Sequence, residues 1–183
     1  MRTRPLYATW LLAGLGLLAA PGCHRADAEA AGHLLASNDY EAVMGWLDGT
    51  GSVTRERAHS GSHAVKVDGG TEYGLGYGLA LSQVADHPLH KLHLEAWGLM
   101  TDAQSTAQLG VQVYDPAQLK PVFSEGIDYA AAVQTPGKWV KISKDITLPD
   151  NATGTQQLRV FLWRGSASSP AYLDDLRISE ITQ

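Results

Sequence analysis

The sequence predicts an all-β fold: a two-sheet antiparallel β-sandwich (jelly roll) preceded by a signal peptide and a short tether. From residue 38 onward no long window shows the 3.6-residue period of a helix, whereas apolar and polar residues alternate in short segments. Turn residues, among them many of the 19 glycines, separate these segments. About nine or ten short strands of this kind favour two packed sheets, and closing them into a jelly roll hides most strand edges.

The first half of the chain contains four of the expected strands. They cover residues 40–47, 53–56, 63–68 and 72–83. Asp68-Gly69-Gly70 ends the third strand as a turn. Glycines at positions 74, 76 and 78 interrupt the fourth, which predicts bulges or a close approach of another backbone.

The second half predicts six more strands, and its alternation is stricter. They cover residues 90–101, 109–113, 121–129, 139–148, 158–163 and 171–181. Residues 121–129 alternate weakly, so this strand is expected at a sheet edge.

Residues 1–22 have the pattern of an export signal. Arg2 and Arg4 form a basic start, and the apolar run from 10 to 20 is shorter than the roughly 20 residues that span a bilayer. Cys23 is the only cysteine, and its place after this run resembles the lipobox of bacterial lipoproteins. The resemblance implies a lipid anchor on Cys23 and a place in the bacterial cell envelope, at the outer membrane. Cleavage after residues 26–28 is the alternative and would discard Cys23.

The expected organisation is a signal peptide over residues 1–22, a polar tether over 23–37 and one domain over 38–183. The chain carries 14 basic and 19 acidic residues, with a formal net charge of −5. Nucleic acids and anionic membrane surfaces attract basic patches, so this charge argues against both as partners.

Two adjacent carboxylates, Asp174 and Asp175, lie in the last expected strand. Neighbouring side chains of a strand point to opposite faces, so the pair cannot act together as an acid and base on one substrate. One carboxylate should point inward among Leu and Ile, where something positive must satisfy it. A calcium ion would suit such oxygen ligands, and a solvated or salt-bridged pair at a strand edge is the alternative.

Period two also predicts an aromatic surface opposite the core. Arg159, Phe161 and Trp163 alternate with aliphatic residues on one strand, as do Trp97 and Tyr114 on two others. If the aliphatic residues face the core, these five side chains form one outward surface that could bind a ligand. The alternative is that individual rings pack beneath loops.

Five motifs occur in an order that resembles a known group of proteins. They are Asn38-Asp39-Tyr40-Glu41 with Gly45-Trp46, the segments 59–67 and 91–97, Gly137-Lys138-Trp139, and the segment 173–178. Together they resemble carbohydrate-binding-module jelly rolls of the galactose-binding-like superfamily, across nearly the whole chain after the tether. Tyr40 departs mildly from the phenylalanine usual at its position.

The resemblance implies that the first and last strands are neighbours and that a structural calcium joins them through Glu41 and Asp174. It also implies that Trp46 and Trp139 belong to the core. The function it implies is a non-catalytic surface lipoprotein that binds a poly- or oligosaccharide through the aromatic surface. A cell-envelope protein-interaction or adhesion module is the alternative. An enzyme is disfavoured, because no strand face carries paired acids.

His87, His90 and His93 recur every three residues, a spacing that would align ligands on a helix. Pro88 and the alternation that follows indicate a loop entering a strand instead, so a zinc site is not expected.

Overall fold

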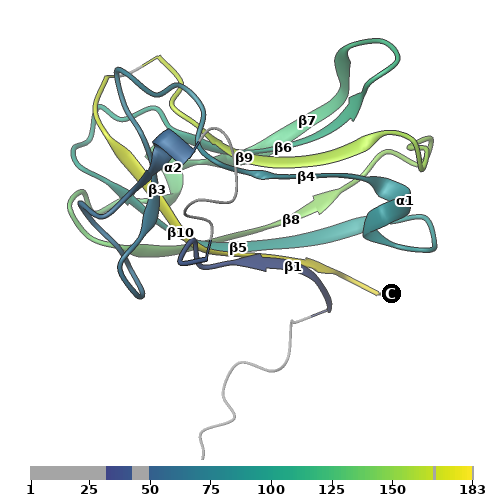
Figure 1. Ribbon diagram of the computed structural model, residues 1–183, viewed down its shortest axis with the longest axis horizontal. Coiled ribbons are helices and arrows are strands. Elements are labelled where there is room, and N and C mark those ends of the chain that lie inside the picture. The colour runs from purple at the N-terminus through teal and green to yellow at the C-terminus, as the bar shows by residue number, and fades with distance from the viewer. Residues whose placement is uncertain (1–31, 43–49, 167, 183) are drawn as a thin grey trace, which may run out of the picture.

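Two antiparallel sheets lie face to face and enclose one core (Figure 1). The computed structural model describes residues 32–42, 50–166 and 168–182. The sandwich and the antiparallel pairing are those that the sequence predicts.

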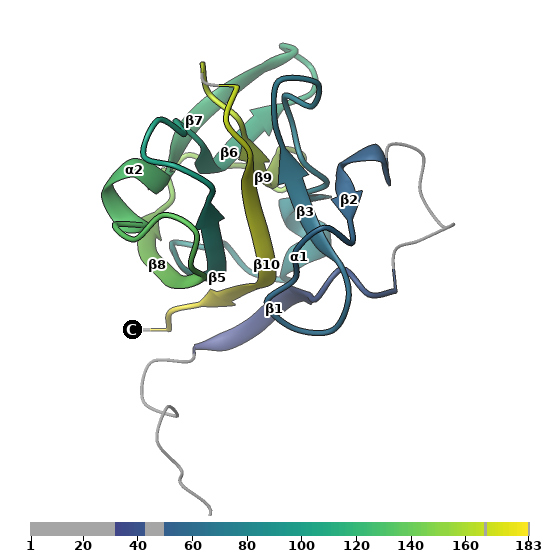
Figure 2. The same cartoon turned by 90° about the vertical axis from the view of Figure 1, so that its left-hand side faces the viewer.

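The larger sheet has six strands and contains both ends of the described chain. Its order is β2 (Val53–Thr54), β3 (Ala64–Val67), β10 (Ala171–Glu180), β5 (Lys91–Met100) and β8 (Val140–Thr147). β1 (His33–Asn38) also pairs with β10, and Figure 2 shows the two strands side by side.

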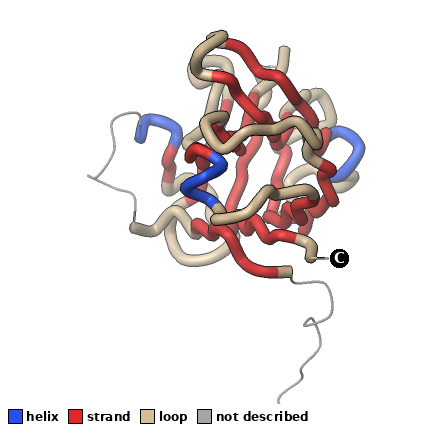
Figure 3. The backbone as a smooth tube through the Cα atoms, turned by 90° about the vertical axis from the view of Figure 1, so that its right-hand side faces the viewer, coloured by secondary structure: helices blue, strands red, loops and turns tan. Residues whose placement is uncertain are grey.

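The smaller sheet has four strands in the order β4 (Tyr77–Ala80), β9 (Gln157–Trp163), β6 (Gln108–Asp115) and β7 (Lys120–Asp128). In the part of the chain that the structure describes, the helices are the single turns η1 (Thr50–Ser52), α1 (Leu81–Val84) and α2 (Tyr129–Ala132), and strands are the main regular structure (Figure 3). Within the described residues, no helix has the length and apolar character needed to cross a membrane.

The core forms because each strand gives its aliphatic side chains to the inner face. Leu158, Val160 and Leu162 of β9 are fully buried, and Leu92, Leu94 and Ala96 of β5 face them from the other sheet. Apolar burial of this kind is the main force that holds two sheets together. The opposite side chains of each strand are thereby turned away from the core.

The structure corrects the predicted N-terminal part of the domain. Residues 33–37, predicted as tether, belong to β1 instead. The strand predicted over 40–47 does not begin as one, because Tyr40, Glu41 and Ala42 form a bend and residues 43–49 lie outside the described residues. Trp46, predicted as core, is among the latter.

The fourth predicted strand is also shorter than expected. Only residues 77–80 of the segment 72–83 form β4, and a helical turn follows. The predicted close approach of a backbone is confirmed at Gly76, where a Cβ would meet the Val160 carbonyl. A Cβ on Gly74 would meet the Val65 side chain, and nothing lies within 4 Å of where a Cβ on Gly78 would be. The edge position predicted for residues 121–129 is confirmed by β7.

Candidate functional site

Four of the five predicted surface residues lie together on the outer face of the smaller sheet. Arg159, Phe161 and Trp163 point outward from β9, and Tyr114 points outward from the neighbouring strand β6. Their strands are adjacent, so the side chains belong to one continuous surface. We call it the β9 face.

The pairing register places Trp163, Phe161 and Arg159 in three neighbouring rows that run across the strands, and Tyr114 lies in the next row with Gln157. Trp163 lies between Tyr73 and Gln108, and Arg159 lies between Gly78 and Gln112. Between these two rows, Phe161 pairs with Gly110, which in turn pairs with Gly126. A strand rises about 3.3 Å per residue, so the rows of Trp163 and Arg159, four residues apart, are separated by about 13 Å.

The row that contains Phe161 is recessed relative to the rows on either side, because glycines flank Phe161. A Cβ on Gly110 would stand 3.2 Å from the Phe161 ring, so the ring lies directly over the backbone of β6. Gly76 lies against Phe161 on the other side. The result is a depression of about 460 Å³ lined by Tyr73, Gln108, Gly110, Gln112, Ser124, Arg159, Phe161 and Trp163.

One end of the depression is aromatic and acidic. Tyr73 is 56% exposed and meets the Phe161 ring edge-on, with the ring centroids 5.7 Å apart. The indole N–H of Trp163 donates to Oε1 of Glu72 at 3.4 Å. Flat rings that are partly open to solvent can stack on the apolar face of a cyclic ligand.

The other end carries a fixed cation. The Arg159 guanidinium lies over the Tyr114 ring, with its carbon 3.5 Å from the ring centroid. Its Nε and Nη2 both donate to Oε1 of Gln157, at 3.1 and 2.8 Å. Tyr114 therefore has one ring side occupied by Arg159 and serves as a support for that cation.

Polar side chains without protein partners complete the face. The side chains of Gln108, Gln112 and Ser124 make no hydrogen bond to any residue that the structure describes, and all three line the depression. Amides and hydroxyls in this state are available to donate to and accept from a ligand. Gln108, Tyr73 and Ser124 were not predicted from the sequence, because their place on the face depends on strand pairing.

Trp97 does not lie on the β9 face, so its predicted membership in one shared surface is wrong. It belongs to β5, which pairs with β8 and β10 in the larger sheet, and its outward side is the opposite face of the molecule. There the His59 ring stacks on it, with centroids 3.8 Å apart and planes 12° from parallel.

Trp139 was predicted as core and lies instead beside this second aromatic group. It is partly exposed and meets His59 and Tyr172 edge-on, with centroids 5.9 and 6.5 Å away. It precedes β8 on the outer side of the larger sheet, away from the sandwich interior.

The two adjacent carboxylates do not point to opposite faces as predicted, because the register of β10 shifts after Asp174 and Asp175 has a positive φ, and both bond to residues of the loop 59–63. Asp174 pairs with Trp97 on the outer side of the larger sheet and is fully buried under that loop. Its Oδ2 accepts from the backbone N–H groups of His59 and Ser60 at 2.7 and 3.2 Å, and its Oδ1 accepts from the N–H of Asp175 at 2.8 Å. Burial raises the pKa of Asp174, and these N–H donors act against that rise.

Glu41 holds the other end of the same loop. Its Oε1 accepts from the N–H groups of Ser62 and His63, both at 2.7 Å, and its Oε2 lies 2.9 Å from Nδ1 of His63. The bond to His63, with the two backbone bonds, lowers the pKa of Glu41 to about 2. Gly61 has a φ of 56°, and a side chain there would collide with this carboxylate.

Glu41 and Asp174 therefore fasten the loop 59–63 to the body, and the residues around them do not fit a calcium ion as they stand. Calcium takes 6–8 oxygen ligands, whereas each carboxylate here has one oxygen that already accepts two backbone N–H groups. Among the described residues no group of three or more His, Cys, Asp or Glu side chains could hold a metal. Calcium binding itself remains a prediction.

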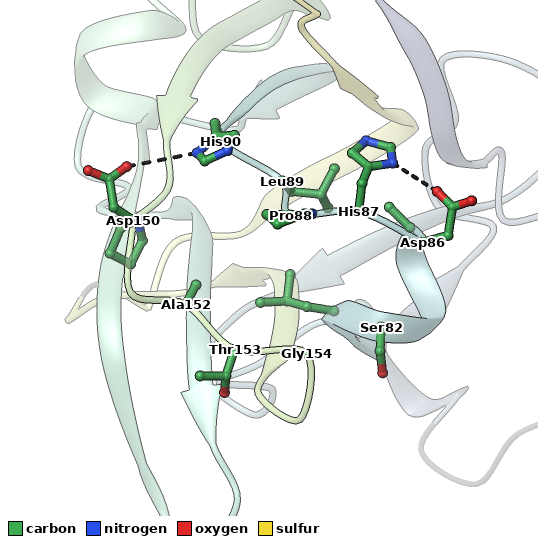
Figure 4. A pocket seen from close by; sticks show the side chains of 13 residues that line it. Ser82, Asp86, His87, Pro88, Leu89, His90, Asp150, Ala152, Thr153 and Gly154 are labelled. Atoms are coloured by element: carbon green, nitrogen blue, oxygen red, sulfur yellow. Dashed lines mark hydrogen bonds and ion pairs between the residues drawn. The ribbon is translucent and has the colours of Figure 1, made fainter.

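The histidines that follow one another every three residues do not converge. Figure 4 shows a pocket of about 240 Å³ beside α1, in which His87 points to Asp86 and His90 points to Asp150 on opposite sides. His93 pairs with Asp145, outside this pocket. Each of the three histidines has its own carboxylate, as expected for surface ion pairs rather than for a zinc site.

Comparison with solved structures shows the same fold in carbohydrate-binding modules. The CBM22-1 xylan-binding domain of Paenibacillus barcinonensis Xyn10C has a TM-score of 0.53 and 22% identity, with 85% of this chain and 99% of that domain covered. Its CBM22-2 xylan-binding domain has a TM-score of 0.53 and 20% identity, with coverage of 80% and 99%.

A third similar structure contains a bound sugar. The CBM22-1–GH10 modules of the Clostridium thermocellum xylanase Xyn10B, complexed with xylohexaose, have a TM-score of 0.51 and 10% identity over 83% of this chain and 29% of that one. No protein-family model and no curated protein matches the chain. The chain thus has the jelly-roll fold of carbohydrate-binding modules.

Proposed function

We propose that this protein binds a poly- or oligosaccharide on the β9 face and has no catalytic activity of its own. The observation that carries the proposal is the depression in which the Phe161 ring lies over Gly110 between two rows of aromatic and unpartnered polar side chains. Sugar rings present an apolar face for stacking and hydroxyls at the rim for hydrogen bonds.

The fold supports the same proposal. The similar structures include domains named as xylan-binding. The absence of catalysis is supported by the depression itself: no carboxylate is among the residues that line it, so it lacks the acid pair that glycoside hydrolysis requires.

The proposal includes a lipid anchor on Cys23 that holds the domain at the bacterial cell envelope. The support is the apolar run and the lone cysteine of the sequence. The structural calcium predicted at Glu41 and Asp174 stays a prediction outside this proposal, because backbone N–H groups already occupy these carboxylates.

The test is a pair of tryptophan substitutions, Trp163→Ala on the β9 face and Trp97→Ala on the opposite face. A stacked ring contributes on the order of 1 kcal/mol, which corresponds to a five- to tenfold loss of affinity. Titration with soluble xylan and a glycan array should show this loss for Trp163→Ala and none for Trp97→Ala.

Melting curves of both variants provide the control for folding. If Trp163→Ala costs several kcal/mol of stability, as truncation of a core Trp does, the residue is structural. If the original protein binds no glycan on the array, the protein-interaction alternative replaces carbohydrate binding.

A further inference from the structure

We propose that the β9 face recognises an acidic glycan, and that Arg159 binds the carboxylate of a uronic acid residue in it. This inference rests on the proposed function and specifies the ligand class. Its starting point is that none of the ion pairs among the described residues includes Arg159.

The guanidinium of Arg159 is held in place, and some of its N–H donors have no partner among the described residues. Two of its five N–H groups bond to Gln157, and its plane lies over the Tyr114 ring. The three remaining N–H groups have no partner among the described residues. A planar cation fixed in this way is prepared for bidentate binding of a carboxylate, the geometry that Arg favours over Lys.

The surroundings leave room for such a ligand. Gly78 of β4 lies opposite Arg159, and nothing stands within 4 Å of where its Cβ would be. On the other side, Arg159 is flanked by Gln112, whose amide is free to bond a ligand. The cation is therefore open to the depression and to the β4 edge of the sheet.

Two acids of the face, Glu72 and Asp128, lie at the end away from Arg159. Glu72 contacts Trp163. Trp163 is four residues from Arg159 on β9, so these two residues lie about 13 Å apart along the strand. Asp128 on β7 pairs with Gln108, in the row of Trp163, and its carboxylate caps α2 through Ala130. Asp115 is adjacent to Tyr114 at the Arg159 end of the face. The amides of Gln118 and Gln156, rather than the guanidinium, bond its carboxylate.

The experiment compares one glycan with and without its charge. The full chain in detergent is titrated with a xylan that carries glucuronic acid side groups, and with the same xylan after its carboxyl groups are reduced to alcohols. We expect the acidic form to bind roughly tenfold more tightly. The difference should shrink as salt rises. Polygalacturonate carries its carboxylates in the main chain. Its binding therefore shows whether Arg159 binds a main-chain uronic acid or only one in a side group.

Three variants complete the design. Arg159→Gln should abolish the preference for the acidic form, and Arg159→Lys should keep only part of it. Arg177→Gln removes the same charge from β10 on the other sheet and should leave the preference unchanged.

The outcomes separate this inference from the proposed function. If both forms of xylan bind equally and Phe161→Ala weakens both, carbohydrate binding stands and the acidic specificity is overturned. A preference that survives Arg159→Gln overturns it as well. If no glycan binds, the proposed function fails, and the inference fails with it.

Discussion

Replacement of Asp174 by Ala tests the fastening of the 59–63 loop. The substitution leaves the N–H groups of His59, Ser60 and Asp175 without their acceptor. An unsatisfied buried donor lowers the free energy of unfolding by about 1–3 kcal/mol. The loop can turn some of the three N–H groups toward water, which reduces the total loss. The pKa of Asp174 is raised by burial, so its charge is itself held at some cost. We therefore expect a net loss of about 3 kcal/mol, and with it a melting temperature lower by roughly 10 °C.

The assay is urea unfolding, in which the midpoint should fall while the slope stays constant. Asp175→Asn is the matched control: Asp175 has a φ of 49°, which Asn tolerates, and its carboxylate bonds only the side chains of His59 and Ser60. We expect this control to lose less than about 1 kcal/mol of unfolding free energy. Equal losses in both variants would refute the assigned role of Asp174.

The same measurement addresses calcium. If N–H groups are the true partners of Asp174, unfolding midpoints should be the same in chelator and in millimolar calcium. A ligand that binds only the native state would raise stability by RT ln(1 + [L]/Kd), about 2.7 kcal/mol at one hundred times Kd. A calcium-dependent rise of that size, absent in Asp174→Ala, would show that the ion displaces the N–H donors.

Three other substitutions test separate parts of the molecule. Glu41 has a pKa lowered from 4.5 to about 2, so its stabilising charge is fully present above pH 4.5 and lost as pH falls toward 2. Glu41→Gln should therefore flatten the decline of melting temperature across that interval, and an unchanged decline would contradict the assignment. Gly110→Val should move the Phe161 ring, which lies 3.2 Å from the new Cβ, and weaken glycan binding severalfold with the melting temperature nearly unchanged. Cys23→Ser should release the protein from the detergent phase to the aqueous phase; unchanged partitioning would exclude the lipid anchor.

The outward side of a regularly alternating strand such as β9 could be predicted from the sequence, because period two is a local property. Phe161 and Trp163 face away from Leu162 on β9 whatever the rest of the chain does. What period two does not specify is the sheet to which a strand belongs. Trp97 was therefore assigned to the right side of its strand and to the wrong face of the molecule.

Long-range pairing accounts for the other differences. β1 has no clear alternation and forms through its pairing with β10, about 140 residues later in the chain. Two of the three partners of Asp174 are backbone N–H groups 114 and 115 residues away, and backbone groups leave no signal in a sequence. Gln108 and Ser124 join the candidate site only through the register of β6 with its neighbours.

The pairing of β1 with β10 also determines how the domain would respond to mechanical load. A force applied at residue 32 enters the body through β1, whose first residue, His33, lies opposite Glu180 near the end of the last strand. Ladder hydrogen bonds lie perpendicular to the strands. A pull along β1 therefore strains all of these bonds at once, whereas a pull away from the sheet opens them one after another. The direction in which the chain is pulled thus decides whether the hydrogen bonds between β1 and β10 must break together, at high force, or one after another, at low force.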